Sequence, residues 1–334
     1  MQRRFRVSLT ARLFKACAAS VALCSAACAQ TPAAPERFYD VEFRIALEPG
    51  DPVARVTIAI AQDAPLAREL KLRHDAARHR AFAGDGGIDV GPERVTWTVP
   101  PDGGELSYEV SIPDAKPSGS YTAYVASDWA LFRAFDVIPS IATRTAAGAR
   151  SRSRMTFDLD EGASVTTAYA PSRDGGFVVD LPDRRFSRPA GWIVVGDIGE
   201  RIDSIGSVRL VVAGPKNNGV RRLDILAFLR WNLPAVVSVF PDYPSRLLIV
   251  SADDPLWRGG LSGPASVYLH ADRPLISENG TSTLLHELVH VACGWRAAPG
   301  DDWIVEGVAE YYAIEHGDKQ RRGPFSTADN HDAA

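Results

Sequence analysis

Two histidines and a glutamate within the stretch Thr283–Val291 could bind a metal ion and activate water. The stretch contains H-E-x-x-H in an apolar run without Gly or Pro, and this pattern predicts an α-helix. Residues four apart share one face of a helix, so His286 and His290 can direct ring nitrogens at one ion. Zinc suits the pair because it binds imidazole, accepts a carboxylate as third ligand and keeps a fourth position for water. Glu287, beside the ion, could remove a proton from that water.

A second helix is expected at Trp303–Tyr312, where the sequence reads W-I-V-E-G-V-A-E-Y-Y. Asp301 or Asp302 would cap its start, and Gly317 would end it. A segment that contains Gly and Pro separates the two helices and supplies a turn. Antiparallel packing of the two helices can bring Glu306 onto the ion as third ligand.

The two motifs together resemble those of the gluzincin metallopeptidases, and most closely those of the glycyl aminopeptidase family and its aminopeptidase N relatives. The resemblance implies one Zn²⁺ per chain, bound by His286, His290 and Glu306, with Glu287 as the general base. Glu310, one turn after Glu306, matches the thermolysin-type position whose carboxylate holds a ligand histidine from outside the ligand set. The resemblance therefore implies a zinc metallopeptidase whose partner is a peptide or protein substrate.

Residues 1–29 have the features of an export signal. Five basic residues and no acid precede an apolar run, Ala16–Ala27, that is too short to span a bilayer. Ala27-Cys28-Ala29 provides an A-x-A site, so we expect cleavage after Ala29 and a periplasmic or secreted protein. The alternative is a lipoprotein anchored through Cys28. Apart from this run, the sequence contains no transmembrane segment by length and apolarity.

Charge and cysteine content exclude several kinds of partner and cross-link. The net charge is −4, and it falls to −9 once the five basic residues of the signal are removed. This acidic balance argues against nucleic acid or an anionic membrane as the main partner. Three of the four cysteines lie in the signal, so Cys293 remains alone and no internal disulfide is expected.

Apolar and polar residues alternate with a period of two from residue 37 to about residue 112. Turns rich in Gly, Pro and Asp separate the alternating runs. This pattern predicts an N-terminal antiparallel β-sandwich, and shorter strand-like runs extend it to a first domain at residues 30–205. The basic stretch 144–154 is expected to be an exposed loop.

The gluzincin catalytic domain is expected at residues 206–320, with a flexible tail at 321–334. The sequence predicts strands at Val208–Val212 and Leu247–Val250 and a helix at Val220–Trp231. A short, separate helix is expected at 234–240. Together with the resemblance, these elements indicate an α+β fold in which the β-sandwich precedes a compact, thermolysin-like α/β zinc-peptidase domain.

The segment Gly259–Gly263 leads into a predicted strand at Ala265–Leu269. In gluzincins the strand here forms the sheet edge along which the substrate peptide lies, which makes Gly260, Ser262 and Ser266 candidate substrate contacts. Aminopeptidase N relatives carry Gly-x-Met-Glu-Asn on this edge, and its Glu binds the free amine of the substrate. The matching segment here has no carboxylate, so the resemblance does not extend to aminopeptidase specificity.

A tyrosine from a helix further along the chain stabilises the oxyanion in the family, and here Tyr311 and Tyr312 are the candidate donors. The missing carboxylate on the edge segment and the use of Tyr311 or Tyr312 in place of the family's later tyrosine leave an alternative function open. The alternative is a non-catalytic zinc-containing protein that binds peptides with a degenerate peptidase fold. The presence of Glu287 favours an enzyme, because a structural zinc site needs no general base.

Overall fold

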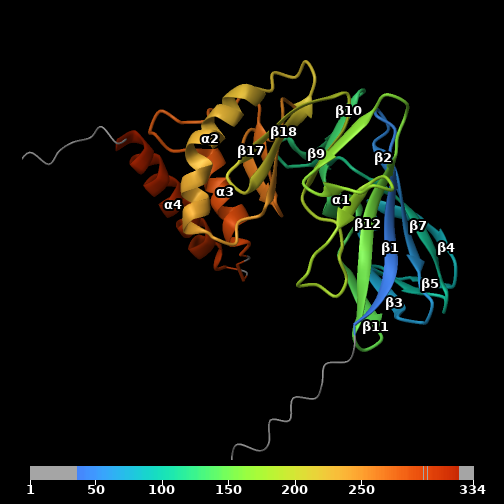
Figure 1. Ribbon diagram of the computed structural model, residues 1–334. Coiled ribbons are helices and arrows are strands. Elements are labelled where there is room, and N and C mark those ends of the chain that lie inside the picture. The colour runs from blue at the N-terminus through green and yellow to red at the C-terminus, as the bar shows by residue number, and fades with distance from the viewer. Residues whose placement is uncertain (1–35, 296, 299, 323–334) are drawn as a thin grey trace, which may run out of the picture.

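The computed structural model describes residues 36–295, 297–298 and 300–322. The predicted signal at 1–29 and all but the first two residues of the predicted tail at 321–334 lie outside them, and residues 321 and 322 belong to the last helix. The described chain has four β-sheets and three long helices, all three in its second part, so the fold is α+β (Figure 1). None of the described helices is both long enough and apolar enough to cross a bilayer.

The first part of the chain forms three sheets around a common core. The seven-stranded sheet has the order β14 (Ala170–Pro171), β15 (Phe177–Val179), β12 (Ala149–Asp158), β1 (Arg37–Ala46), β2 (Val53–Ala61), β7 (Gly103–Ser111) and β4 (His79–Gly84). The five-stranded sheet has the order β13 (Ser164–Thr167), β16 (Trp192–Gly196), β10 (Trp129–Arg133), β9 (Tyr121–Val125) and β8 (Asp114–Ala115). The four-stranded sheet has the order β11 (Ile141–Thr145), β3 (Ala67–Arg73), β6 (Arg94–Thr98) and β5 (Gly87–Val90), and a short helix, α1 (Ala134–Val137), follows β10.

Period-two alternation explains how these strands form the core. In β1 the side chains of Val41, Phe43 and Ile45 are buried, while the residues between them are at least partly exposed. The predicted antiparallel pairing holds between β1 and β2, but on its other side β1 pairs in parallel with β12. The chain between these two strands forms other strands, and it provides the long crossover that a parallel pair requires.

The basic stretch 144–154 is not one exposed loop, because most of it belongs to β12. Its arginines alternate with smaller residues and occupy one face of the strand. Arg152 forms an ion pair with Asp40 of β1 at 2.8 Å, and Arg154 forms another with Glu42 at 2.9 Å. The alternation is typical of a strand with one charged face, but the basic composition of the stretch led to the prediction of a loop.

The second part of the chain forms a five-stranded sheet with the order β17 (Ile198–Ile205), β18 (Val208–Pro215), β19 (Arg246–Ala252), β21 (Ser266–His270) and β20 (Gly260–Gly263). Strands β18, β19 and β21 are parallel, and the edge strand β20 is antiparallel to β21. The expected domain boundary between residues 205 and 206 falls inside the β17–β18 hairpin, so β17 pairs with the second part rather than the first.

Helices α2 (Arg222–Val239) and α3 (Thr283–Cys293) pack on one face of this sheet, and α4 (Asp302–Arg322) packs against α2 and α3. Two predictions for them are wrong. Helix α2 continues through Pro234, although two helices were expected; burial of Val236 beyond the proline favours the continuous helix. Helix α4 continues past Gly317, because glycine permits a helix end without imposing one.

A buried layer joins the two parts of the chain. Strand β16 directs Ile193 into the core of the first part and Trp192 and Val194 towards the second sheet. Strand β19 likewise directs Leu248 towards β16 and Leu247 towards the helices. Strands buried on both faces have continuous apolar runs such as W-I-V-V-G and L-L-I-V, and their stacking gives the layered shape in Figure 1.

We predict that Leu248→Ala lowers the free energy of unfolding by about 2–5 kcal/mol, because Leu248 is fully buried in this layer and its truncation leaves a cavity. Leu223→Ala is the matched control, since Leu223 is 66% exposed on α2 and its loss should change stability by less than about 0.5 kcal/mol. Urea denaturation followed by circular dichroism measures both. Equal urea midpoints for the two variants would show that this buried layer contributes little to the stability of the fold.

Candidate metal centre

Helix α3 holds both histidines of the H-E-x-x-H motif. Ser282 caps its start, where Oγ accepts a hydrogen bond from Leu285 N at 3.3 Å, and Gly294 ends it in the left-handed conformation, with φ of 59°. The apolar side chains of the helix are buried in the core between the sheet and the helices, namely Leu284, Leu285, Leu288 and Val291. This burial fixes the rotation of α3, and His286 and His290 meet α4 on another face.

The structure brings His286, His290 and Glu306 together. His286 Nε2 lies 3.0 Å from His290 Nε2 and 3.1 Å from one carboxylate oxygen of Glu306. The other oxygen of Glu306 lies 3.5 Å from His290 Nε2. Two ligands bound at about 2.0–2.1 Å to a tetrahedral ion lie about 3.3–3.4 Å apart. The three ligand atoms therefore have the spacing of a single zinc site.

Glu310 determines which nitrogen of His286 faces this centre. His286 Nδ1 lies 3.3 Å from the Glu310 carboxylate, which only accepts when it is ionised, so Nδ1 donates and, in a neutral ring, Nε2 keeps its lone pair. That lone pair meets a carboxylate and a second imidazole, and a cation between the three would satisfy all of them. Two imidazoles and a carboxylate are also the ligand set of catalytic zinc sites, which leave a fourth position open.

Glu287 lies between α3 and the edge strand. It is 8% exposed, and its carboxylate accepts a hydrogen bond from the backbone N–H of Ser262 at 2.8 Å. Burial raises the pKa of the Glu287 carboxyl, while the charges of His290 and His286 and the hydrogen bond from Ser262 oppose the rise. Glu287 is outside the converging ligand set but lines the cleft beside it.

The centre opens into a cleft of about 390 Å³, with β20 among its walls. Six residues outside the predicted site also line it: Trp257, Leu261, Trp295, Ala297, Asp302 and Val305. They belong to the segment around β20, the α3–α4 connection and the start of α4. The sequence does not show that they share one cleft, because their common position comes from the packing of α3 and α4 beside the sheet edge.

Two of the three candidate substrate contacts lie on the sheet edge. Gly260 and Ser262 belong to β20, the last strand of the sheet, and both line the cleft. The prediction for Ser266 is wrong, because it lies on β21 between β19 and β20 and is fully buried. Its hydroxyl accepts a hydrogen bond from the backbone N–H of Trp192 at 2.9 Å. Which strand of the β20–β21 hairpin faces outward depends on the pairing with β19, which the sequence does not show.

The tyrosines proposed as oxyanion donors lie on α4, but neither is among the described residues that line the cleft. The Tyr312 ring packs edge-on against Phe240 at the end of α2, with 5.2 Å between ring centroids. Tyr311 is 58% exposed. The geometry therefore gives no support to Tyr311 or Tyr312 as an oxyanion donor.

A second group of candidate ligands, Asp253, Asp254 and His270, lies at the carboxyl ends of β19 and β21. The His270 ring is buried, and its Nε2 lies 3.4 Å from the Asp254 carboxylate. The backbone N–H of Asp272 donates to His270 Nδ1 at 3.1 Å, so a neutral ring carries its hydrogen on Nε2. With no lone pair at Nε2, this group is better explained by attraction between His270 and the carboxylates than by a bound metal.

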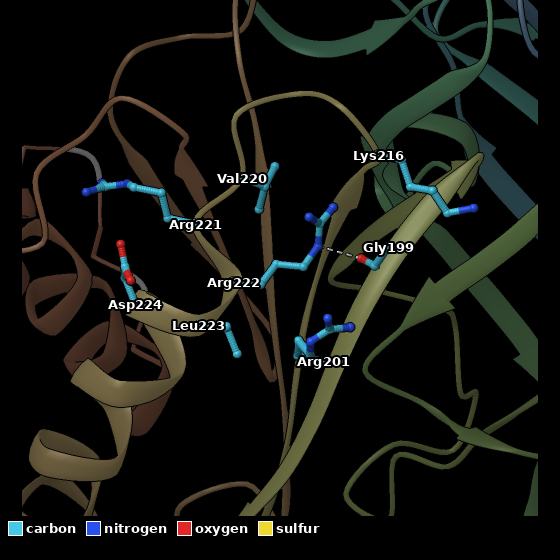
Figure 2. A pocket seen from close by; sticks show the side chains of 8 residues that line it. All are labelled: Gly199, Arg201, Lys216, Val220, Arg221, Arg222, Leu223 and Asp224. Atoms are coloured by element: carbon cyan, nitrogen blue, oxygen red, sulfur yellow. Dashed lines mark hydrogen bonds between the residues drawn. The ribbon is translucent and has the colours of Figure 1, made fainter.

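A basic hollow at the start of α2 also has a structural explanation (Figure 2). Arg222 donates to the backbone carbonyls of Gly199, Gly214 and Pro215 at 2.6–2.8 Å. Its guanidinium therefore joins the start of α2 to strands β17 and β18. Because these carbonyls already accept from Arg222, the hollow does not present it as a free anion-binding group.

Comparison with known proteins indicates the fold. No family model and no curated protein matches the sequence. One similar solved structure is a Glu-to-Ala variant of the M1 zinc metallopeptidase from Deinococcus radiodurans, bound to a Tyr-Ser-Ala substrate. It is 18% identical to this chain, and the TM-score is 0.54 over 86% of this chain and 71% of that one. Another is an aminopeptidase N family protein from Idiomarina loihiensis, 13% identical, with a TM-score of 0.54 over 75% of this chain and 47% of that one. The chain thus spans about half the length of the second protein, and it shares the fold of these metallopeptidases.

We predict that Glu306→Ala and Glu310→Ala differ in their effect on zinc binding. Glu306→Ala removes a direct ligand and should abolish stoichiometric zinc, whereas Glu310→Ala only frees the His286 ring and should weaken zinc affinity about 10- to 100-fold. Titration with a chromophoric zinc chelator measures both affinities. Glu278→Ala, an exposed change between β21 and α3, serves as the control. Wild-type affinity in Glu310→Ala would remove Glu310 from the site.

We also predict that Gly260→Ala separates β20 from α3. A Cβ at this position would lie 2.7 Å from Thr283 Cγ2 and 2.9 Å from Glu287 Cγ, so the strand or these side chains must shift, at a cost of about 1–3 kcal/mol in unfolding free energy. Zinc should remain bound, since the ligands lie on α3 and α4. Gly87→Ala is the control, because the nearest atom to its Cβ would be 3.6 Å away. Urea denaturation of both variants is the measurement, and equal stability would contradict the close approach.

Proposed function

We propose that this protein is a zinc metallopeptidase of the gluzincin type, which binds one Zn²⁺ and hydrolyses peptide bonds with Glu287 as general base. The observation that carries the proposal is the convergence of His286, His290 and Glu306 at 3.0–3.5 Å beside a buried glutamate and an open sheet edge. The fold shared with M1 zinc metallopeptidases supports it. The proposed architecture is a β-sandwich followed by a thermolysin-like domain.

The residues of the centre divide the chemistry between them. When bound by the two histidines and Glu306, zinc supplies a Lewis acid that polarises the scissile carbonyl and acidifies water. Glu287 takes the proton from the attacking water and later transfers it to the leaving amine. Glu310 accepts the Nδ1–H of His286 and thereby keeps the Nε2 lone pair directed at the centre.

The edge strand β20 binds the substrate in this proposal. Among the described residues its outer side has no partner strand, so an extended peptide can add there through main-chain hydrogen bonds. Because β20 carries no carboxylate, nothing on the strand selects a free α-amine. The proposed activity is therefore peptide hydrolysis without a requirement for a free N-terminus.

The proposal also includes export to the periplasm or the medium. The basic segment, apolar run and A-x-A site at 1–29 support cleavage after Ala29, and acylation of Cys28 is the alternative that would anchor the protein. Intact mass of the exported protein distinguishes the two products.

Glu287→Gln tests the proposed function. Glutamine keeps the size of the side chain and can still accept from Ser262 N–H, but it does not take up a proton. We expect zinc to stay at one per chain while hydrolysis of a mixed peptide library falls at least about 10²-fold. Glu278→Gln, an exposed change of the same kind, should retain wild-type activity.

Two outcomes would contradict the proposal. Wild-type protein that binds zinc and peptides but cleaves none of the library would identify the alternative, a non-catalytic peptide-binding protein. Loss of zinc together with activity in Glu287→Gln would show that Glu287 supports the structure of the site rather than serving as its base.

A further inference from the structure

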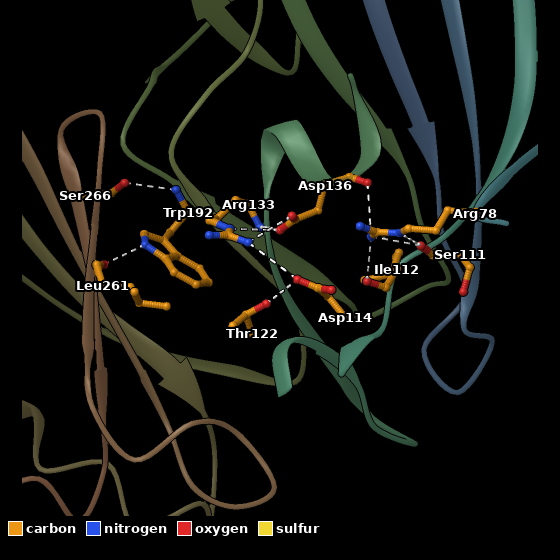
Figure 3. A network of polar contacts seen from close by, with 10 residues as sticks. All are labelled: Arg78, Ser111, Ile112, Asp114, Thr122, Arg133, Asp136, Trp192, Leu261 and Ser266. Carbon is orange, nitrogen blue, oxygen red and sulfur yellow. Dashed lines mark hydrogen bonds and ion pairs between the residues drawn. The ribbon is translucent and has the colours of Figure 1, made fainter. Parts of the chain in front are cut away.

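One residue of the first part, Trp192 on β16, reaches the edge of the second sheet (Figure 3). Its backbone N–H donates to Ser266 Oγ and its indole Nε1–H donates to the Leu261 carbonyl, both at 2.9 Å. Ser266 lies on β21 and Leu261 on β20. A single residue from outside the second sheet therefore holds both strands of the hairpin that forms its edge.

The packing around Trp192 leaves little space for movement. Trp192 is fully buried, and its ring lies 5.3 Å from that of Tyr268 on β21. At the preceding residue, Gly191, a Cβ would lie 2.7 Å from the Pro264 carbonyl oxygen and 2.8 Å from Ser266 Oγ. The turn of the hairpin thus rests directly on the backbone of residues 191 and 192.

A network of polar contacts, with the buried carboxylate of Asp136 at its centre, lies on the other side of Trp192 (Figure 3). Arg133 of β10 is its cross-strand neighbour, with the guanidinium 5.5 Å from the indole ring. Arg133 donates twice to the buried Asp136 carboxylate at 3.2 Å. Arg78 in turn donates to the backbone carbonyls of Asp136, Ser111 and Ile112. The position of Trp192 is therefore fixed by the first part of the chain.

The Leu261 carbonyl and the Ser262 N–H belong to the same peptide group. The carbonyl accepts from Trp192 Nε1, and the N–H donates to the Glu287 carboxylate at 2.8 Å. Since a peptide group is planar and trans, its C=O and N–H point in opposite directions and turn together. Hydrogen bonds at the two ends of one peptide group also strengthen each other. Trp192 and Glu287 thus hold one peptide group of the edge strand from opposite sides.

We propose that Trp192 is a positioning residue of the metal cleft. It fixes the 261–262 peptide group, and through that group it fixes both the Glu287 carboxylate and the edge strand on which the substrate would lie. The effect on catalysis rests on the proposed function, whereas the effect on the peptide group does not.

Trp192→Phe is the test, because it removes the indole N–H and keeps an aromatic ring. Trp129→Phe is the matched control: Trp129 is 5% exposed, lies in the same buried layer and packs its ring against that of Tyr124. Hydrogen–deuterium exchange of residues 259–265 reports on the edge strand without relying on activity. Zinc content, kcat and KM for a cleaved peptide complete the comparison.

We expect exchange across residues 259–265 to become about 10-fold faster in Trp192→Phe, the change that follows from loss of one buried hydrogen bond. Zinc should remain at one per chain. We expect kcat/KM to fall about 10-fold, mainly through kcat, because Glu287 acts in the chemical step. Trp129→Phe should leave both the exchange of this segment and kcat close to wild type.

Ser266→Ala provides a second variant with a smaller change in volume, and it should accelerate exchange in the same segment because it removes the acceptor of the Trp192 backbone N–H. Unchanged exchange in both Trp192→Phe and Ser266→Ala, or equal acceleration in Trp129→Phe, would overturn the proposal. Faster exchange with wild-type kcat would overturn the link to Glu287. If the wild type cleaves no peptide, the proposed function fails, and the exchange data alone then support or overturn the role of Trp192.

Discussion

The close approach of α3 to the edge strand β20 is the constraint on which the candidate site depends. Position 260 has no space for a side chain, and the strand lies near enough for the Ser262 N–H to reach the Glu287 carboxylate. A buried carboxylate is costly unless hydrogen bonds compensate for lost hydration. The backbone of β20 supplies that compensation and at the same time leaves Glu287 beside the cleft.

The layered architecture determines how this approach is maintained. Strands β10 and β16 are buried between the core of the first part and the second sheet, and β19 and β21 lie between that layer and the helices. One face of the second sheet therefore supports α3, against which α4 packs, and these two helices carry the candidate metal ligands. The other face meets Trp192, which holds the edge of the same sheet. The first part of the chain thus contacts the edge strand that lines the cleft.

The surroundings of the three converging residues also distinguish between kinds of zinc site. A structural zinc is enclosed by four protein ligands, whereas a catalytic zinc has three and an open position. Here two histidines and one glutamate converge, the Glu306 side chain is 60% exposed, and the group borders a cleft that the edge strand helps to line. Among the described residues the arrangement has the openness of a catalytic site, which is why an enzyme is proposed ahead of a binding protein.

The sequence by itself determined the features that depend on local periodicity. Residues four apart share a helix face, so H-E-x-x-H was enough to place His286 beside His290, and alternation was enough to identify strands such as β1. Only the tertiary structure decided which strands pair. In the structure β12 is parallel to β1, β17 belongs to the second sheet, and Ser266 is buried within that second sheet. It also decided that Trp192 holds the 261–262 peptide group, because a hydrogen bond to a backbone carbonyl leaves no trace in the identity of the residue that accepts it.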